Sequence, residues 1–576
     1  MIKKLSKAIR EYKKESLLTP FFVALEVVLE VLITYCMALL IDKGVEASNM
    51  SMIIKIGGIL VLMAVLSLVF GMLSGIFCAK ATSGFAKNLR HDVFFKIQKF
   101  SFLNIDKFKS SGLVTRLTTD VNRISHAYQM IIRIAVRAPL MIIFSFIMIV
   151  KINVKMSFIF LGVMPVLLAG LIFIARKVYP IFGTVFEEYD NLNNVVSENL
   201  NGIRVVKSFV SEDKEVRKFK RVSNKIYKYF KKAENLLAFN NPLMQLCVYA
   251  TILLISWFGA KLVVQDMLTT GELMSLFTYI MQVLSSLMML SMIFVMIIIS
   301  RESSSRICEV LDEEIDLKNN DNCCTSVKDG SISFRDVSFS YVNRSDKLCL
   351  KNINLDIKSG EFVGIIGGTG SGKSSVVQLI PRLYDVTNGS VLVGGVDVRN
   401  YDIKTLRDEV AVVLQKNVLF SGTIIENLRW GNVNATYDEV VEASKLACAY
   451  EFINEMPNKF DTYLEEGGTN VSGGQKQRLC IARAILKKPK ILILDDSTSA
   501  VDTKTDAKIK DALREYIPST TKIIIAQRIN SVIDCDKIIV MDNGEINGIG
   551  THEELLKSNK IYKEVYDSQN GGIVNE

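Results

Sequence analysis

The sequence predicts a two-domain membrane protein, in which an all-α domain with six transmembrane helices precedes an α/β domain. Long uncharged apolar runs occupy about the first 300 of the 576 residues, and 49% of all residues are hydrophobic. The remaining part contains a strand, a glycine-rich loop and a helix in succession. That succession is typical of an α/β domain built around a parallel sheet.

Six segments are apolar and long enough to cross a bilayer as helices, since one crossing needs about 20 apolar residues. Four of them carry no charge, whereas the first contains Glu26 and Glu30 and the third contains Arg133 and Arg137. The two members of each pair are four residues apart and therefore share a helix face. The predicted helices are residues 17–41, 56–79, 131–150, 156–175, 238–260 and 273–300.

Two interpretations of these charged pairs are open. Charges inside a membrane usually pair with each other or face an aqueous cavity. The glutamates and arginines therefore either line a cavity or form ion pairs between the first and third helices. The methionines of the sixth helix allow a similar choice between packing and a soft surface for apolar ligands; they are Met281, Met288, Met292 and Met296.

The connections between the helices predict the orientation in the membrane. Residues 42–51, 151–155 and 264–272 form short connections, whereas residues 80–129 and 176–239 are long, helix-like and rich in Lys and Arg. Cytoplasmic connections carry the excess of basic residues. We therefore expect a multi-pass protein of the plasma membrane with its N-terminus, its long connections and its α/β domain in the cytoplasm.

Charge and cysteine usage argue against two other classes of protein. The net charge of +9 comes from basic residues between the apolar runs, so we expect no nucleic-acid partner. The ten cysteines show no C-x-x-C spacing, which predicts reduced structural thiols. The N-terminal segment is basic and amphipathic, but no small-residue cleavage site follows the apolar run after it, so a signal peptide is not expected.

A phosphate-binding motif lies near the start of the α/β domain. Residues 319–330 break the helical pattern and are predicted to be a linker between domains 1–318 and 331–576. Residues 367–374 then fit G-x-x-x-x-G-K-S between a strand and a helix, so backbone N–H groups can surround phosphate oxygens. Lys373 is expected at the β- and γ-phosphates, and Ser374 on Mg²⁺. The predicted nucleotide-binding residues here are Gly367, Gly368, Thr369, Gly370, Ser371, Gly372, Lys373, Ser374 and Ser375.

The sequence ILILDDSTSAVD, residues 491–502, supplies a second, acidic motif. Asp495 ends an apolar strand about 120 residues after the glycine loop, where a Walker B aspartate would hold magnesium. Taken together, the two motifs predict a protein that binds a nucleoside triphosphate.

Between these motifs, VSGGQKQR at residues 471–478 opens a helix and resembles the signature motif of ATP-binding cassette (ABC) proteins. Tyr341 is similar to the aromatic residue that stacks on adenine, and Gln415 to the Q-loop glutamine that ligates Mg²⁺. Glu466 resembles the X-loop glutamate, and residues 499–502 resemble the D-loop. The resemblance covers the whole chain and implies a bacterial half-transporter of the type IV, multidrug-type exporter class. It implies ATP and Mg²⁺ as cofactors, with Ser374, Gln415 and Asp495 as metal ligands.

The sequence departs from this family at two catalytic positions. The family has a glutamate after the Walker B aspartate, which polarises the attacking water, and a switch histidine at the γ-phosphate. Here these positions hold Asp496 and Gln527. Aspartate is one methylene shorter and general-base catalysis depends on reach, while glutamine cannot carry a proton. We therefore expect a site that binds MgATP and hydrolyses it slowly or not at all.

The resemblance also implies a head-to-tail dimer, in which the signature of each chain acts on the ATP of the other. The signature residues Ser472, Gly473, Gly474 and Gln475, with Asp502 of the D-loop, would then serve ATP bound to the partner. An intact signature beside an impaired site predicts a different half-transporter as partner, which supplies the glutamate and the histidine. Residues 197–209 resemble the coupling segment that would touch the partner's nucleotide domain.

The predicted function is one subunit of a heterodimeric, ATP-driven exporter of drugs, lipids or peptides that works by alternating access. Its transported substrate would be small and amphipathic or hydrophobic, and the sequence leaves the choice among these classes open. The alternatives are an ATP-gated channel, a regulatory membrane subunit, or a homodimeric exporter with slow hydrolysis.

Overall fold

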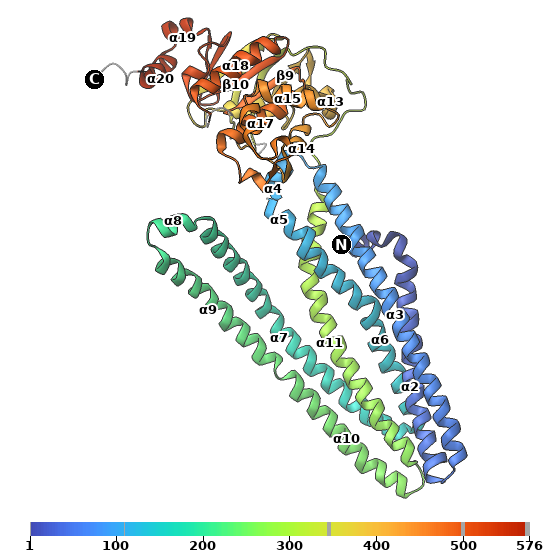
Figure 1. The fold of residues 1–576 in the computed structure, drawn as a ribbon. Helices are drawn as coiled ribbons and strands as arrows, with labels where there is room; N and C mark the ends of the chain where they lie inside the picture. Colours follow the sequence, from blue (N-terminus) through green and yellow to red (C-terminus); the bar gives the residue numbers. More distant parts are fainter. Residues whose placement is uncertain (1, 109, 342–346, 497–500, 571–576) are drawn as a thin grey trace. The chain divides into compact units, whose positions relative to one another are not determined.

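The computed structural model describes residues 2–108, 110–341, 347–496 and 501–570 (Figure 1). The chain divides into two compact units. The first comprises Met1–Gln98 and Lys109–Glu313, and the second comprises Lys99–Phe108 and Glu314–Glu576. The second unit therefore includes a short piece of the predicted long connection 80–129, folded as helix α4 (Phe102–Phe108).

The first unit is all-α, and its described residues contain six helical segments long and apolar enough to span a membrane. The fold class and the six spans agree with the sequence prediction. The helices are α1 (Ile2–Leu5), α2 (Lys13–Leu40), α3 (Met50–Gln98), α5 (Ser110–Thr115), α6 (Val121–Ile152), α7 (Val154–Asn201), α8 (Ile203–Ser208), α9 (Glu212–Leu237), α10 (Asn240–Val264) and α11 (Thr270–Asp312), with a 3₁₀ helix at Ser6–Tyr12 and short π-helices at Ile41–Glu46 and Arg116–Asp120.

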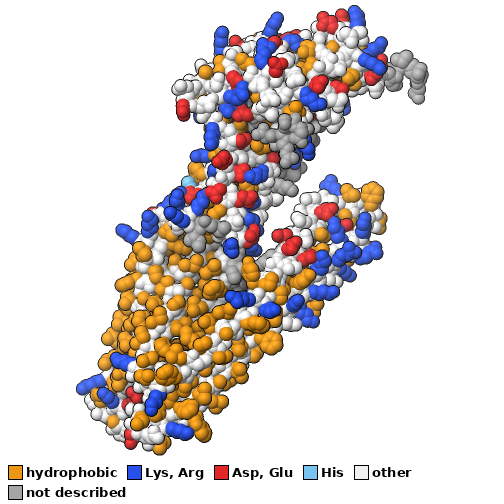
Figure 2. Space-filling view, turned by 180° about the vertical axis from the view of Figure 1, so that it is seen from behind, with side chains coloured by type: hydrophobic (Ala, Val, Ile, Leu, Met, Phe, Trp, Pro, Cys, Tyr) orange, Lys and Arg blue, Asp and Glu red, His pale blue; other side chains and the backbone are white. Residues whose placement is uncertain are grey.

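Five of the six helical segments have 43–53 residues and are much longer than a bilayer requires. Helix α3 has 49 residues, which at 1.5 Å per residue is about 74 Å, against a hydrocarbon core of about 30 Å. Its apolar middle is exposed, with Val61 and Leu68 both more than 60% accessible. Figure 2 shows a broad apolar surface on this unit with basic side chains at its borders. Lipid would cover such a surface, and the helix ends extend beyond it.

Both glutamates of the first membrane helix pair with one arginine of the third. The Arg137 guanidinium of α6 donates hydrogen bonds to Glu26 Oε1 at 2.5 Å and to Glu30 Oε1 at 2.6 Å, both on α2. The described residues show no ion pair for Arg133. The ion-pair interpretation therefore holds for Arg137, while one oxygen of Glu26 stays buried without a hydrogen-bond partner in the described structure.

The methionines of the sixth membrane helix do not form part of the core of this unit. Met281 is 48% exposed and Met292 is 64% exposed on α11. The opposite side of the same helix is buried, because Leu276, Tyr279 and Ile280 are fully inaccessible. Within this chain, the packing interpretation therefore fails for the two exposed methionines.

The second unit contains twelve described strands in three sheets. Four strands form an antiparallel sheet in the order β2-β1-β4-β5, six form a largely parallel sheet in the order β12-β11-β3-β10-β9-β6, and β7 pairs with β8. The strands are β1 (Ile332–Phe339), β2 (Leu350–Ile357), β3 (Phe362–Gly367), β4 (Asn388–Val393), β5 (Val396–Asp397), β6 (Val410–Val413), β7 (Gly422–Thr423), β8 (Tyr463–Leu464), β9 (Ile491–Asp495), β10 (Thr521–Ile525), β11 (Lys537–Asp542) and β12 (Glu545–Gly550).

Both faces of the six-stranded sheet are buried, which explains the continuous apolar runs of its strands. On β9, Leu492 and Leu494 belong to one core and Ile491 and Ile493 to the other. One core includes α15, α17 and α18, and the other includes α12 and the antiparallel sheet. The remaining helices of this unit are α12 (Lys373–Leu379), α13 (Ile403–Glu409), α14 (Ile424–Arg429), α15 (Tyr437–Leu446), α16 (Tyr450–Glu455), α17 (Gly473–Leu486), α18 (Thr503–Tyr516), α19 (His552–Ser558) and α20 (Lys560–Asn570).

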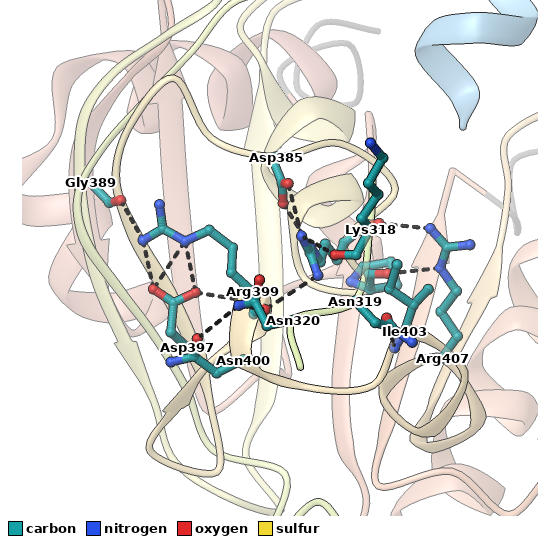
Figure 3. A network of polar contacts seen from close by, with 12 residues as sticks. Lys318, Asn319, Asn320, Asp385, Gly389, Asp397, Arg399, Asn400, Ile403 and Arg407 are labelled. Atoms are coloured by element: carbon teal, nitrogen blue, oxygen red, sulfur yellow. Dashed lines mark hydrogen bonds and ion pairs between the residues drawn. The ribbon is translucent and has the colours of Figure 1, made fainter. Parts of the chain in front are cut away.

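The start of the predicted linker is fastened to the second unit by polar contacts (Figure 3). The Asn319 amide donates to Asp402 Oδ1 at 2.6 Å and accepts from the Ile403 N–H at 3.0 Å. The buried Arg382 guanidinium donates to the Lys318 carbonyl at 3.4 Å. This part of the linker is thus held along the edge of the second unit.

Candidate nucleotide site

The topology of the parallel sheet brings the predicted site residues together. Strands β3, β10, β9 and β6 are neighbours and run parallel, so their carboxyl ends lie at one edge of the sheet. The glycine loop follows β3, Gln527 follows β10, Asp495 ends β9, and Gln415 follows β6. Ligands of open α/β sheets bind at such an edge. Residues that are up to 160 positions apart in the sequence therefore meet there.

Two positions show why the loop is built from glycine. Gly372 has φ +96°, a left-handed conformation that residues with a side chain rarely adopt. A Cβ on Gly367 would lie 2.2 Å from the Met541 carbonyl oxygen. The loop over Gly368, Thr369, Gly370 and Ser371 therefore closes tightly between β3 and α12. Such a loop directs backbone N–H groups toward a bound anion.

Lys373 lies over the glycine loop. Its Nζ donates to the Gly367 carbonyl at 2.9 Å and to the Gly368 carbonyl at 2.7 Å. Burial lowers the pKa of this ammonium group, an effect that the charges of Asp495 and Asp496 oppose. A phosphate group is a stronger acceptor for a cation than two carbonyls are. Lys373 is therefore placed to exchange its carbonyl partners for phosphate oxygens.

Ser374 and Asp495 bring two side-chain oxygen atoms together at a spacing that suits magnesium. The Ser374 hydroxyl donates to Asp495 Oδ1 at 3.0 Å. Two neighbouring ligands of an octahedral Mg²⁺ at about 2.1 Å would be about 3.0 Å apart. The pKa of Asp495 lies above its ordinary value, mainly because the carboxyl group is buried. The hydrogen bond from Ser374 lowers this pKa, whereas the charge of Asp496 raises it. A divalent cation would offset the burial of this carboxylate.

Asp496 has an unusual conformation and two amide neighbours. Its φ is +48°, in the left-handed region, and its N–H donates to the Ile525 carbonyl at 3.1 Å. The Gln527 amide donates to Asp496 Oδ2 at 2.9 Å, and the Gln415 amide approaches the same oxygen at 3.5 Å. The two positions at which the sequence departs from the family pattern are thus hydrogen-bonded to each other.

Tyr341 lies beside the glycine loop in an aromatic cluster. Its hydroxyl is 3.0 Å from Ser375 Oγ and donates to Gln378 Oε1 at 3.1 Å. Its ring packs edge-on against Tyr384, with centroids 5.1 Å apart. The Tyr384 hydroxyl donates to Asp106 of α4 at 3.0 Å. The position predicted for adenine stacking is therefore linked, through one tyrosine, to a segment more than 230 residues earlier in the chain.

The signature motif forms a helix start. Ser472 is the N-cap of α17, where its hydroxyl accepts from the Gln475 N–H at 3.3 Å and the Gln475 side chain accepts from the Ser472 N–H at 2.9 Å. Gly473 and Gly474 form the first turn, and Ser472 and Gly473 are exposed. No described contact joins Ser472 to the glycine loop within this chain. The motif therefore presents its surface outward.

The D-loop lies only partly within the described residues, because residues 497–500 are outside them. Asp502 is the N-cap of α18, and its side chain accepts from the Thr505 N–H at 2.9 Å. Hydrogen bonds from Thr505 lower the pKa of Asp502. This carboxylate is thus ionised and tied to its own helix.

Comparison with known proteins agrees with this geometry. A family model described as ABC transporter transmembrane region matches residues 16–288, and one described as ABC transporter matches residues 350–499. The uncharacterized ABC transporter ATP-binding protein YfiB of Bacillus subtilis is 35% identical over 570 residues, which are 98% of this chain and 99% of the relative. The chain belongs to the ABC transporter family. The ATP-dependent lipid A-core flippase of Desulfotalea psychrophila is 32% identical over 84% of each chain.

Family membership confirms the coarse predictions from the sequence. This ABC transporter has a transmembrane region and an ATPase domain in a single chain, which is the organisation of an exporter half-transporter. It is a multi-pass membrane protein. Its ABC domain supports ATP hydrolysis coupled to transport.

Sequence reasoning missed several residues around the site of this ABC transporter. Tyr341 contacts Gln378 and Tyr384, and Tyr384 in turn contacts Asp106. None of these three residues belongs to a recognisable motif. Gln569 of α20 contacts the backbone of the switch residue Gln527 and of Ile529. Contacts of this kind depend on tertiary packing, so no local pattern in the sequence indicates them.

Proposed function

We propose that this ABC transporter is one half of a heterodimeric exporter and that its own nucleotide site retains ATP rather than turning it over. The observation that carries the proposal is the hydrogen bond of 2.9 Å from the Gln527 amide to Asp496. It joins the two positions at which the expected glutamate and histidine are absent. Because Asp496 and Gln527 contact each other, we infer that both substitutions affect the same step, the hydrolysis of ATP.

The chemistry of this contact opposes hydrolysis. A general base must reach the attacking water and take up its proton, a contribution of typically 10²–10⁴-fold. Asp496 is one methylene shorter than glutamate, and one of its oxygens already accepts a hydrogen bond from Gln527. Glutamine is neutral and carries no proton that it could transfer. The site would therefore bring water and phosphate together without efficient proton removal.

Binding of ATP and Mg²⁺ does not depend on these two residues. Tyr341, the glycine loop and Lys373 provide contacts for adenine and phosphates. The metal ligands we propose are Ser374, Asp495 and Gln415, all of which offer oxygen atoms of the kind that Mg²⁺ prefers. Residues 367–375 act as the nucleotide-binding loop.

The intact signature supports a partner of a different kind. In a head-to-tail dimer, Ser472, Gly473, Gly474 and Gln475 of this chain contact the ATP held by the partner, with Asp502 close to the same interface. A partner that carries the glutamate and the histidine then has one complete site. Hydrolysis at that site resets the pair, and ATP at the site of this chain stabilises the closed state.

The substrate proposed for the pair is a lipid or another small amphipathic or hydrophobic molecule. A relative that is 32% identical bears the name of a lipid A-core flippase. The exposed methionines of α11 add a polarizable surface that adapts to varied apolar shapes. The long basic connections support a cytoplasmic location for the ATPase domain.

Purification of the transporter from its native membrane in mild detergent tests the proposal, followed by mass analysis of the intact complex and an ATPase assay. We expect a second, different half-transporter at equal stoichiometry and ATPase activity only in the pair. A homodimer of this chain that hydrolyses ATP by itself would contradict both the heterodimer and the impaired site. It would favour the homodimeric exporter instead.

A further inference from the structure

The side chain of Gln569, in the last turn of α20, spans the backbone of the switch loop. Its Nε2 donates to the Gln527 carbonyl at 2.9 Å, and its Oε1 accepts from the Ile529 N–H at 2.8 Å. One planar amide thus contacts the two residues on either side of Arg528. Such two-point contacts fix orientation as well as distance.

The loop needs this support at that point. The N–H of Ala526 still donates to the Ile365 carbonyl at 3.1 Å, as the continuation of the β10–β3 pairing. Past Ala526, the chain leaves the sheet and turns into the single 3₁₀ turn Ile529–Ser531. Gln569 is the only described hydrogen-bond partner of the Gln527 carbonyl. Gln569 of α20 therefore supplies the described hydrogen bond to the backbone carbonyl of the switch residue.

Helix α20 is a firm support. Tyr562 is 1% exposed, and its hydroxyl lies 2.8 Å from His552 Nδ1 of α19. The apolar side chains of Val565 and Tyr566 pack against the core that also contains Ile529. Gln569 follows Val565 by one helical turn, on the same side of the helix. Its amide is therefore presented to the switch loop by a helix anchored in the core.

We propose that Gln569 is a positioning residue that directs the side chain at position 527 toward Asp496. The inference rests on the proposed role of these two residues in the nucleotide site. Because Gln569 holds only backbone atoms, it acts on whichever side chain stands at position 527. Loss of the contact lets the switch residue move away from the carboxylate and from the γ-phosphate, which affects the chemical step more than ATP binding.

Two substitutions distinguish the hydrogen bond to the Gln527 carbonyl from the hydrogen bond to the Ile529 N–H. Gln569→Ala removes both of them. Gln569→Glu keeps an acceptor for the Ile529 N–H but places a carboxylate oxygen against the Gln527 carbonyl. Ser568→Ala is the matched control, because Ser568 is an exposed neighbour on α20 with no described hydrogen bond.

Hydrogen–deuterium exchange of the purified complex tests the contact itself, without reference to catalysis. In the peptide that covers residues 527–531, we expect exchange to be about tenfold faster in Gln569→Ala, because opening of the loop becomes easier. Gln569→Glu retains the protection of the Ile529 amide, and Ser568→Ala matches the native chain. Unchanged exchange in Gln569→Ala would overturn the inference.

Steady-state kinetics test the positioning role. The background carries Asp496→Glu and Gln527→His to repair this site, and Ser472→Arg to silence the composite site on the partner. In it, we expect Gln569→Ala and Gln569→Glu each to lower kcat by at least about fivefold with little change in the KM for ATP, since small misplacements cost rate. A rise in KM at constant kcat would overturn the inference. A background without turnover would count against the proposed function, and the exchange measurement would then decide on the contact.

Discussion

Asp496 and Gln527 are the residues at which the proposed function of this ABC transporter is decided. The carboxylate accepts a hydrogen bond from the amide at 2.9 Å, and its own backbone is in the left-handed region at φ +48°. Residues in such conformations persist where the surrounding structure holds them, often at functional sites. In the proposed function, the residues that bind ATP and Mg²⁺ stay in place, while the site lacks a general base that reaches the attacking water.

Repair of this pair is the first prediction. Asp496→Glu alone should change turnover at this site by less than about tenfold, because the neighbouring glutamine cannot serve as the switch. Asp496→Glu together with Gln527→His should raise it by about 10²-fold, within the usual contribution of a general base. Single-turnover ATP hydrolysis by the complex measures this.

The control for this repair is Asp495→Asn in the repaired chain, which removes a proposed metal ligand and should abolish the gain. Full activity from Asp496→Glu alone would contradict the account that two defects act together. In that case Gln527 would be an adequate switch residue.

At the residue scale, the sequence predicts what motifs encode and little else. Spacing alone predicts that Lys373, Ser374 and Asp495 lie together, because a strand, a glycine loop and a helix determine where their side chains can lie. Asp106 and Gln569 are not found, since each meets the site through a contact across at least 40 positions of sequence. Sequence reasoning also missed that Ser472 and Gln475 cap helix α17, although S-x-x-Q is a capping pattern.

At the scale of elements, apolar length predicts the six membrane helices, whereas their lateral contacts need the structure. Helix α6 carries two arginines one turn apart that the sequence cannot tell apart. In the structure, Arg137 binds Glu26 and Glu30, and Arg133 has no described ion pair. The rotation of α6 about its own axis decides which of the two arginines faces the glutamates of α2. That rotation depends on packing along both helices.

This difference gives the second prediction. Arg137→Ala should lower the thermal stability of the complex in detergent, by an amount equivalent to about 3–5 kcal/mol, because it leaves two partly buried carboxylates without a cation. Arg133→Ala is the matched control and should have a much smaller effect. A chain with Glu26→Gln, Glu30→Gln and Arg137→Gln should recover much of the loss. Equal destabilisation by the two arginine variants would contradict the ion-pair assignment.

At the scale of the whole molecule, the signature and the glycine loop of one chain serve different ATP molecules in the proposed dimer. The signature lies at the exposed start of α17, and the described residues show no contact from Ser472 to the glycine loop. In the proposed dimer, this chain alone lacks a complete site, and ATPase activity is a property of the pair.

The third prediction follows from this sharing. Ser472→Arg should remove most of the ATPase activity of the native complex, at least about tenfold, because the bulky cation occupies the place of a phosphate on the partner's ATP. The substitution also removes a helix cap worth about 1 kcal/mol. Thr436→Arg is the matched control, since Thr436 caps α15 with the same box and lies outside the proposed site. Undiminished turnover in Ser472→Arg would rule out the sharing.

The division of the chain into units has a consequence for engineering. The ATPase unit is not a single stretch of sequence, because it takes in Lys99–Phe108 as well as Glu314–Glu576. Tyr384 binds Asp106 of that insert. A chimera made by exchanging everything after Glu313 would therefore combine a foreign ATPase domain with the original Lys99–Phe108 segment, which would lack its own packing partners. Functional chimeras between relatives will require two grafts, one at each of these segments.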